Sequence, residues 1–107
     1  MDKYYFKTSK VSAEGFYANG KMIIQKGSIA NKVLLSSFPN TLIEIRNDLI
    51  EKGVLTTKGD KLLFTEDFIC SSPSQASALI NGSSSNGLLA WKDCSGKTLK
   101  SNLREID

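Results

Sequence analysis

The residues best placed to do chemistry lie in the segment SSPSQASALINGSSSNGLLAWK, residues 71–92. Ser72 and Ser74 stand at the expected start of a helix, where free backbone N–H groups and the positive end of the helix dipole can bind a phosphate or another anion. The same hydroxyls can instead cap the helix, because a serine side chain accepts hydrogen bonds from those N–H groups. Both interpretations are kept.

Trp91 and Lys92 end the same segment. An exposed indole can stack on a nucleobase while a neighbouring lysine contacts a phosphate. A buried indole is the alternative, because Trp covers a large apolar area and often anchors a core. If the protein binds nucleic acid, the candidate residues are Lys21, Lys26, Ser72, Ser74, Asn86, Trp91, Lys92 and Lys97.

No catalytic residue is expected. The chain has no His, which excludes Ser–His and Cys–His nucleophile pairs. The acid pairs Asp48/Glu51 and Glu66/Asp67 are predicted to lie on an exposed helix face and at the end of a hairpin, where a general acid would not gain a raised pKa.

No cofactor and no metal are expected either. The chain contains no GxxxxGK[ST] loop, and its glycines are too widely spaced for a GxGxxG fingerprint. Cys70 and Cys94 lack a third close ligand for zinc. Free cysteines are often buried, so both are interpreted as small buried thiols.

The net charge of +3 is unevenly distributed. Residues 1–35 carry six Lys against Asp2 and Glu14, whereas residues 36–69 are net acidic. This basic third can attract a polyanion such as nucleic acid, or it can serve solubility alone.

Size and composition indicate one domain spanning residues 1–107, with ordinary hydrophobic and charged fractions of 40% and 23%. No apolar run approaches the roughly 18 residues of a membrane span. The charged, aromatic start of the chain does not resemble a secretion signal. A cytoplasmic protein without membrane contact is therefore expected.

The first third is predicted to be antiparallel β structure. A strand is expected over Lys3–Lys7, and a hairpin joins Ala13–Ala18 to Lys21–Lys26. The pair Asn19-Gly20 between them is typical of a type I′ turn, in which both central residues need positive φ. Val33–Leu35 fits a short strand or a helical turn equally well.

A helix is predicted from Thr41, with Glu44 completing a capping box and Gly53 ending the helix. Its expected apolar face consists of Leu42, Ile45, Leu49 and Ile50. A hairpin of 54–57 with 61–65 follows, so the middle of the chain is winged-helix-like in its order of elements.

A second helix is predicted after the N-cap Ser72, with Pro73 at its first position, Gln75 closing a capping box and Gly82 ending it. Its buried stripe is expected to be Ala76, Leu79 and Ile80, with Ser74, Ser77 and Asn81 facing outward.

The last quarter is predicted as a positive-φ turn at Asn86-Gly87, a strand over 88–92, a turn over 93–96 and a final helical turn over 101–106. The expected fold class is α+β, made of antiparallel hairpins with two to three short helices.

Three blocks carry a family resemblance: GFYANGKMIIQKGSIA, IRNDLIEKGVL and LLFTEDFICSSPSQASALINGSSSNGLLAWKDCSGKTL. Together they resemble a small domain of unknown function that is commonly found C-terminal to GIY-YIG nuclease domains in bacteria. The second half is also similar to the RAMA domain of restriction and adenine-methylase systems. No GIY or YIG segment occurs in the chain, and Leu88 stands where relatives tend to carry an aromatic residue after Asn-Gly.

The resemblance implies an accessory role in DNA transactions or defence, beside a nuclease or methylase domain or protein. The resulting hypothesis is a non-catalytic, nucleic-acid-binding accessory domain. The alternative is a protein-interaction or dimerisation domain, which exposed strand edges would favour. An unrecognised enzyme is the third hypothesis, and it rests only on exposed carboxylates.

Overall fold

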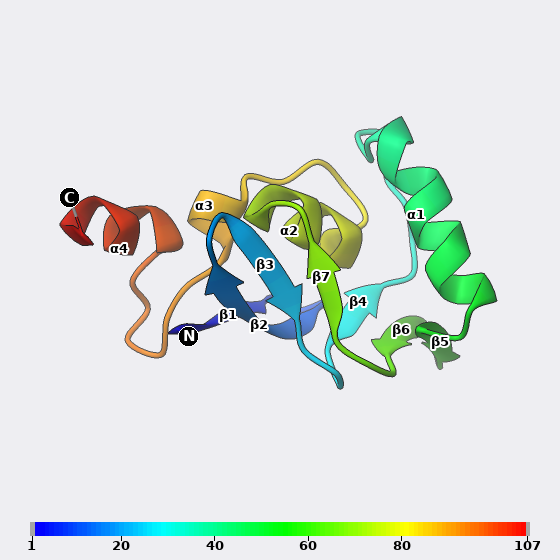
Figure 1. Ribbon diagram of the computed structural model, residues 1–107. Coiled ribbons are helices and arrows are strands. Elements are labelled where there is room, and N and C mark those ends of the chain that lie inside the picture. The colour runs from blue at the N-terminus through cyan, green and yellow to red at the C-terminus, as the bar shows by residue number, and fades with distance from the viewer. Residues whose placement is uncertain (1, 107) are drawn as a thin grey trace.

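The computed structural model describes the backbone of residues 2–106 and the side chains of residues 2–104. Within this part of the chain, one antiparallel sheet combines with short helices, which confirms the α+β fold class (Figure 1). The strands are β1 Asp2–Lys7, β2 Ser12–Ala18, β3 Lys21–Ile24, β4 Ile29–Asn31, β5 Leu55–Lys58, β6 Lys61–Phe64 and β7 Phe68–Cys70. The helices are α1 Asn40–Glu51, α2 Pro73–Asn81, α3 Gly87–Ala90 and α4 Leu99–Ile106. No described helix is long and apolar enough to cross a membrane.

The sheet contains two interrupted strands, and the chain crosses from β4 to β5 at its far edge before β6 pairs back onto β4. One edge of β2 pairs with β1, and its other edge pairs first with β4 and then with β3. The outer edge of β4 pairs with β6, and the outer edge of β3 pairs with β7. Backbone hydrogen bonds bridge the interruptions: Gln25 N donates to Glu14 O at 2.8 Å and Gly27 N to Phe64 O at 2.9 Å. The breaks let the sheet bend without losing its hydrogen bonds.

Both predicted hairpins are confirmed. Asn19 and Gly20 have φ of 50° and 82°, as a type I′ turn requires. The strand after this turn ends at Ile24, two residues before the predicted end. The second hairpin, β5–β6, turns at Gly59-Asp60. It follows α1, as expected for the winged-helix-like middle, and its strand β6 joins the main sheet through β4.

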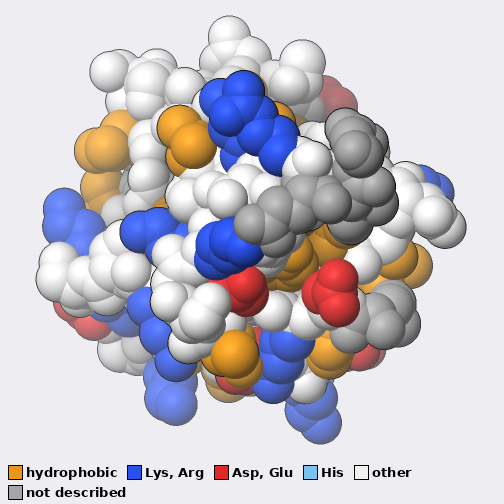
Figure 2. All heavy atoms as spheres, turned by 90° about the vertical axis from the view of Figure 1, so that its left-hand side faces the viewer, with side chains coloured by type: hydrophobic (Ala, Val, Ile, Leu, Met, Phe, Trp, Pro, Cys, Tyr) orange, Lys and Arg blue, Asp and Glu red, His pale blue; other side chains and the backbone are white. Residues whose placement is uncertain are grey.

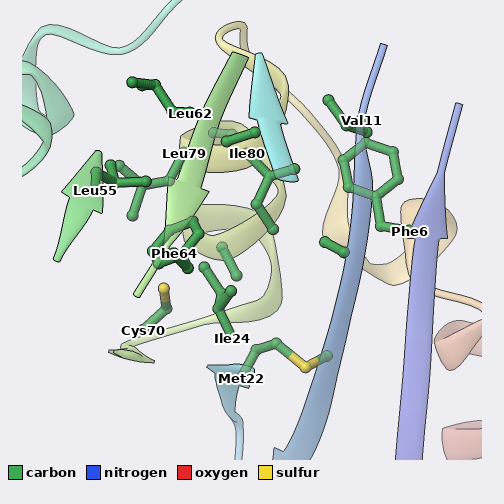
Figure 3. Packing of buried hydrophobic residues seen from close by; sticks show 14 of the residues in the cluster. Phe6, Val11, Met22, Ile24, Leu55, Leu62, Phe64, Cys70, Leu79 and Ile80 are labelled. Carbon is green, nitrogen blue, oxygen red and sulfur yellow. The ribbon is translucent and has the colours of Figure 1, made fainter. Parts of the chain in front are cut away.

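The core lies between one face of the sheet and α2. Met22, Ile24 and Phe64 point from the strands toward Leu79 and Ile80 of the helix, and all five side chains are fully buried (Figure 3). Burying one side chain of this size contributes roughly 1.5–3 kcal/mol. Packing against this face therefore determines which strand residues point inward.

The predicted caps of α2 are confirmed. Ser72 Oγ accepts from Gln75 N at 3.0 Å, while Gln75 Oε1 accepts from Ser71 N at 2.9 Å, one residue earlier than a standard capping box. Gly82 ends the helix with φ of 77°. The expectation that Ser77 faces outward is wrong, because α2 packs against α1, α3 and the sheet, and this serine is fully buried. Its hydroxyl donates to Ser74 O instead.

The predicted capping box of α1 is wrong. The helix begins at Asn40, after Pro39, and no side chain caps it. Its end is as predicted: Gly53 has φ of 79°, and Val54 N donates to Leu49 O at 2.9 Å.

The buried face of α1 also differs from the prediction. Ile50 is 45% exposed, and Arg46 takes a buried position between Leu42 and Leu49. Its guanidinium donates to Leu79 O at 3.0 Å and to Asn31 O. Burial removes water from the guanidinium and thereby lowers its pKa. The two carbonyls partly compensate for this loss of hydration. The arginine thus joins α1 to α2 and β4.

The Val33–Leu35 segment forms neither a strand nor a helical turn. It crosses the end of α2 as a loop, where Leu35 N donates to Gly82 O at 2.8 Å. A Cβ added at Gly82 would lie 2.3 Å from Val33 O, so this close passage requires glycine.

The predicted strand over 88–92 is wrong. Asn86 and Gly87 do not form a positive-φ turn, because Asn86 has φ of −92° and its Oδ1 caps the short helix α3 by accepting from Leu88 N. Gly87 packs directly against the backbone of Pro73. Glycine is needed at position 87 because a side chain would clash with the Pro73 backbone, not because the position has positive φ. A turn rule based on neighbouring residues cannot distinguish these two reasons. The final helix is confirmed and begins at Leu99.

Gly87→Ala should lower the free energy of unfolding by about 1–3 kcal/mol, the usual cost of overpacking a tight interior. The added Cβ would lie 2.2 Å from Pro73 C and would force α3 away from α2. Urea unfolding measures the change. Leu88→Ala, the adjacent exposed position, should change stability by no more than about 0.5 kcal/mol. Equal losses in the two variants would contradict the packing role of Gly87.

Candidate nucleic-acid interface

The face of the sheet opposite α2 carries side chains that are not buried. On β1, Tyr4 and Phe6 point to the core, so Lys3, Tyr5 and Lys7 point to this opposite face. The alternation puts an aromatic ring between two lysines on one strand.

The Tyr5 ring lies between the two ammonium groups. Lys3 Nζ is 5.7 Å and Lys7 Nζ 5.2 Å from the ring centroid, within the range of cation–π attraction. Lys3 Nζ is also 3.3 Å from Glu14 Oε1, on the neighbouring strand directly opposite Tyr5. The cation–π contacts hold both lysines close to the tyrosine, and the ion pair with Glu14 adds a second contact for Lys3.

Lys92 lies on the other side of Tyr5. Tyr5 N donates to Lys92 O at 2.7 Å, and Lys92 N donates to Tyr5 O at 3.0 Å. Directly opposed residues of an antiparallel bridge project their side chains to the same face. The exposed Lys92 side chain therefore shares the face of Tyr5. Lys3, Tyr5, Lys7 and Lys92 are called the Tyr5 patch below.

A hollow of about 290 Å³ lies beside the Tyr5 patch. Its apolar side comes from α3, where Leu89 is 50% exposed. It is lined by Tyr5, Phe6, Lys7, Thr8, Leu89, Ala90 and Lys92. This concavity, called the α3 hollow, is lined by aromatic residues, aliphatic residues and two lysines.

The patch belongs to the end of the molecule formed by β1 and α4. Figure 2 views this end and shows Lys and Arg side chains spread over it, with fewer acidic side chains among them. Lys7 and Lys92 form no ion pair with any residue that the structure describes. Their charge is available to an anionic ligand.

Trp91 is enclosed, so its predicted stacking role is wrong. The indole is 0% exposed, its Nε1 donates to Pro73 O at 3.0 Å, and its ring meets Phe6 edge-on at 5.9 Å. Burial of so large a side chain outweighs any gain from leaving it on the surface. The core-anchor interpretation is confirmed.

Ser72, Ser74 and Asn86 are occupied by the fold. Ser72 and Asn86 cap α2 and α3, and Ser74 Oγ accepts from Gly87 N at 2.9 Å. Ser72 and Ser74 line a separate hollow of about 300 Å³ between the starts of α1 and α2. No Lys or Arg is among the described residues that line it. The capping interpretation therefore accounts for these hydroxyls.

The other predicted lysines are dispersed. Lys21 lies on the same sheet face as Tyr5 but on β3, with β2 between them. Lys26 lies in the break between β3 and β4, where its backbone N donates to Asp67 Oδ1 at 2.7 Å. Lys97 lies in the turn after Lys92. The predicted lysines and the start of α2 therefore do not form one continuous basic surface.

The sequence-based prediction missed Lys3, Tyr5 and Lys7. Their signal is the alternation in KYYFK, which puts both lysines and one tyrosine on the same face of a strand. No pattern near either residue predicts the contact of Tyr5 with Lys92, because the two are far apart in the sequence.

The turn after Lys92 is organised by Asp93. Hydrogen bonds from the Asn102 side chain at 2.9 Å, from Ser95 Oγ at 2.7 Å and from Lys97 N at 2.9 Å lower the pKa of the Asp93 carboxyl. Asn102 Nδ2 also donates to Tyr4 Oη at 3.1 Å. The turn thereby holds α4 against β1, next to the Tyr5 patch.

The two cysteines differ. Burial raises the pKa of the Cys70 thiol to about 12, as expected for a buried thiol, whereas Cys94 is exposed, contrary to the expectation. Among the described residues, no three His, Cys, Asp or Glu side chains gather as they would around a metal ion.

Fold and site together define a small α+β domain with α2 on one face of the sheet and a basic, aromatic patch on the other. The chain belongs to the family described as a domain of unknown function (DUF4357), whose model matches residues 4–103. No curated protein and no solved structure matches it. The expected membership of a family of unknown function is confirmed, while the nuclease and RAMA contexts stay predictions.

Asp93→Ala should change how stability depends on pH. Because the pKa of Asp93 is lowered in the folded protein, its stabilisation is complete above the unfolded pKa of about 4 and is lost as the pH falls through the folded pKa. The difference in unfolding free energy between wild type and variant should therefore shrink as the pH is lowered from about 5. Urea unfolding over this pH range measures it.

Asn102→Ala is the matched variant for this test, because it removes the largest contribution to the lowered pKa and keeps the carboxylate. It should reproduce part of the effect. A stability difference that stays constant with pH would show that Asp93 does not have the inferred role.

Proposed function

We propose that this domain is a non-catalytic accessory module that binds nucleic acid, DNA in the first instance, through the Tyr5 patch. The carrying observation is the Tyr5 ring between the Lys3 and Lys7 ammonium groups, with Lys92 directly opposite. Lysines provide the phosphate contacts that dominate affinity, and an aromatic ring among them provides a stacking surface.

The family resemblance supports a DNA-related setting. Domains of this kind resemble those found next to GIY-YIG nucleases and the RAMA domains of restriction and methylation systems. In this proposal the catalytic step belongs to a nuclease or methylase domain or protein, and the present domain contributes binding.

Salt dependence is the direct test. Fluorescence anisotropy with labelled DNA should show log affinity falling linearly with log salt, with a slope of about −2 if Lys7 and Lys92, the two patch lysines without an ion pair to a described residue, each contact one phosphate. The double variant Lys7→Glu/Lys92→Glu should lose at least about 10-fold in affinity at low salt, because both phosphate contacts become repulsive.

Lys58→Glu/Lys61→Glu is the control, since it changes the net charge equally on the β5–β6 hairpin, at the far end of the molecule (Figure 1). It should reduce affinity by less than about 3-fold. Equal losses in the two double variants would mean that overall charge, rather than the Tyr5 patch, binds DNA. Absence of salt-sensitive binding in the wild type would overturn the proposed function.

A second candidate function, self-association, is favoured by one observation. Val33, Leu34 and Leu35 are consecutive and are 61%, 43% and 51% exposed. Contiguous exposed apolar surface often marks a protein contact. If it joins two copies of this chain, light scattering should give a mass that rises with concentration in the wild type and stays lower in Leu35→Ser. A constant monomer mass for the wild type would exclude this role.

A further inference from the structure

We infer that the Tyr5 patch and the α3 hollow accept single-stranded nucleic acid, with unpaired bases against the rings and in the hollow. This inference rests on the proposed function and specifies its ligand. A single strand would cross β1, running from the α3 hollow over Tyr5 toward Phe16 on β2, past the Glu14 carboxylate that Lys3 neutralises.

The first argument is the chemical mixture at the site. Contacts to duplex phosphates need charged or polar donors and no apolar surface. Here a tyrosine ring and the half-exposed Leu89 lie among the lysines. A nucleic acid can offer these apolar surfaces a partner only where the face of a base is free, and bases in a duplex are stacked on each other.

A second ring extends the same surface. Phe16 is half-buried on β2 and lies directly opposite Lys3, on the face of the sheet that carries Tyr5. It is diagonal to Tyr5 across the strand pair, at a spacing of roughly 7–8 Å. Two successive bases can therefore contact rings on neighbouring strands, as in other sheet surfaces that bind single strands.

The size of the α3 hollow limits what it can hold. At about 290 Å³ it lies just below the roughly 300–1,000 Å³ typical of small-molecule pockets. It can take one ring system but not a helix or a strand of a partner protein. Lys7 and Lys92 are among the residues that line it, and their long side chains can reach the phosphates on either side of an inserted base.

The shape of the site disfavours reading a duplex. Entry into a major groove requires a projecting helix or a two-stranded ribbon. β1 pairs with β2 on one edge and with Lys92 on the other, and α3 is four residues long. Neither element projects, so a flexible strand that adapts to the surface fits better than a rigid double helix.

Stacking on Tyr5 replaces existing contacts. Lys3 and Lys7 now lie over the ring, and the Lys7 ammonium, which has no ion pair with a described residue, can swing toward a phosphate when a base takes its place. The exchange is favourable because stacking on an aromatic ring is stronger than an exposed cation–π contact.

The test compares a labelled oligothymidylate with a mixed-sequence DNA duplex of equal length by fluorescence anisotropy at one low salt concentration. The wild type should bind the single strand more tightly than the duplex. Tyr5→Leu should weaken single-strand binding by about 10-fold, within the range for loss of one stacked base. Duplex binding should change by less than about 2-fold, because the lysines remain.

Matched variants separate stacking from folding. Tyr5→Phe keeps the ring and should retain wild-type binding. Leu89→Ser should weaken single-strand binding, whereas Leu88→Ser, its neighbour outside the hollow, should not. Circular dichroism checks that each variant is folded.

The outcomes distinguish the two proposals. Equal or tighter duplex binding, unaffected by Tyr5→Leu, would overturn the single-strand inference and leave the proposed function standing. Equal losses in Tyr5→Phe and Tyr5→Leu would also overturn it, because the ring would not be the binding element. Failure to bind either oligonucleotide would overturn both the single-strand inference and the proposed function. The same holds if an acidic peptide, tested in the same assay, binds and neither oligonucleotide does.

Discussion

The buried indole of Trp91 is the interaction on which the proposed site depends. Its Nε1–H reaches Pro73 O, and its ring packs against Phe6, so one side chain joins the start of α2, the end of α3 and strand β1. Consecutive residues of extended chain point in opposite directions. Enclosing Trp91 therefore directs Lys92 outward and brings its backbone against Tyr5. The residue that was expected to touch a base instead places the cation beside the ring that can do so.

Arg46 has a similar role at the other end of the molecule. A charged group is costly to bury, and this one is tolerated because it donates to the Asn31 and Leu79 carbonyls and lies 5.7 Å from the Phe38 ring centroid. The contact connects α1 to segments far away in the chain. It makes the helix part of the core although none of its described side chains caps its start.

Features with local signals were predictable from the sequence. The turn at Asn19-Gly20, the Ser72 cap and the end of α1 at Gly53 each depend on a few neighbouring residues, and all three are as expected. The burial of Ser77 and Arg46 depends on elements brought together only by folding, so an amphipathic pattern could not reveal it. The candidate site shows the same contrast between local and long-range features. Lys92 was named from the sequence, but Tyr5 was not, because the two residues are distant in the chain and meet only through a backbone bridge in the folded protein.

The bridge at Lys92 also affects the rim of the sheet. An uncovered outer strand presents a row of unpaired N–H and C=O groups that another chain can extend into a larger sheet. Here the centre of β1 is already engaged by Lys92, and Lys92 in turn pairs with Thr98. On this edge of β1, only the short stretches before and after Tyr5 are not paired by the bridge to Lys92. Strand-to-strand aggregation along this rim is therefore obstructed by the same few residues that bring a positive charge to Tyr5.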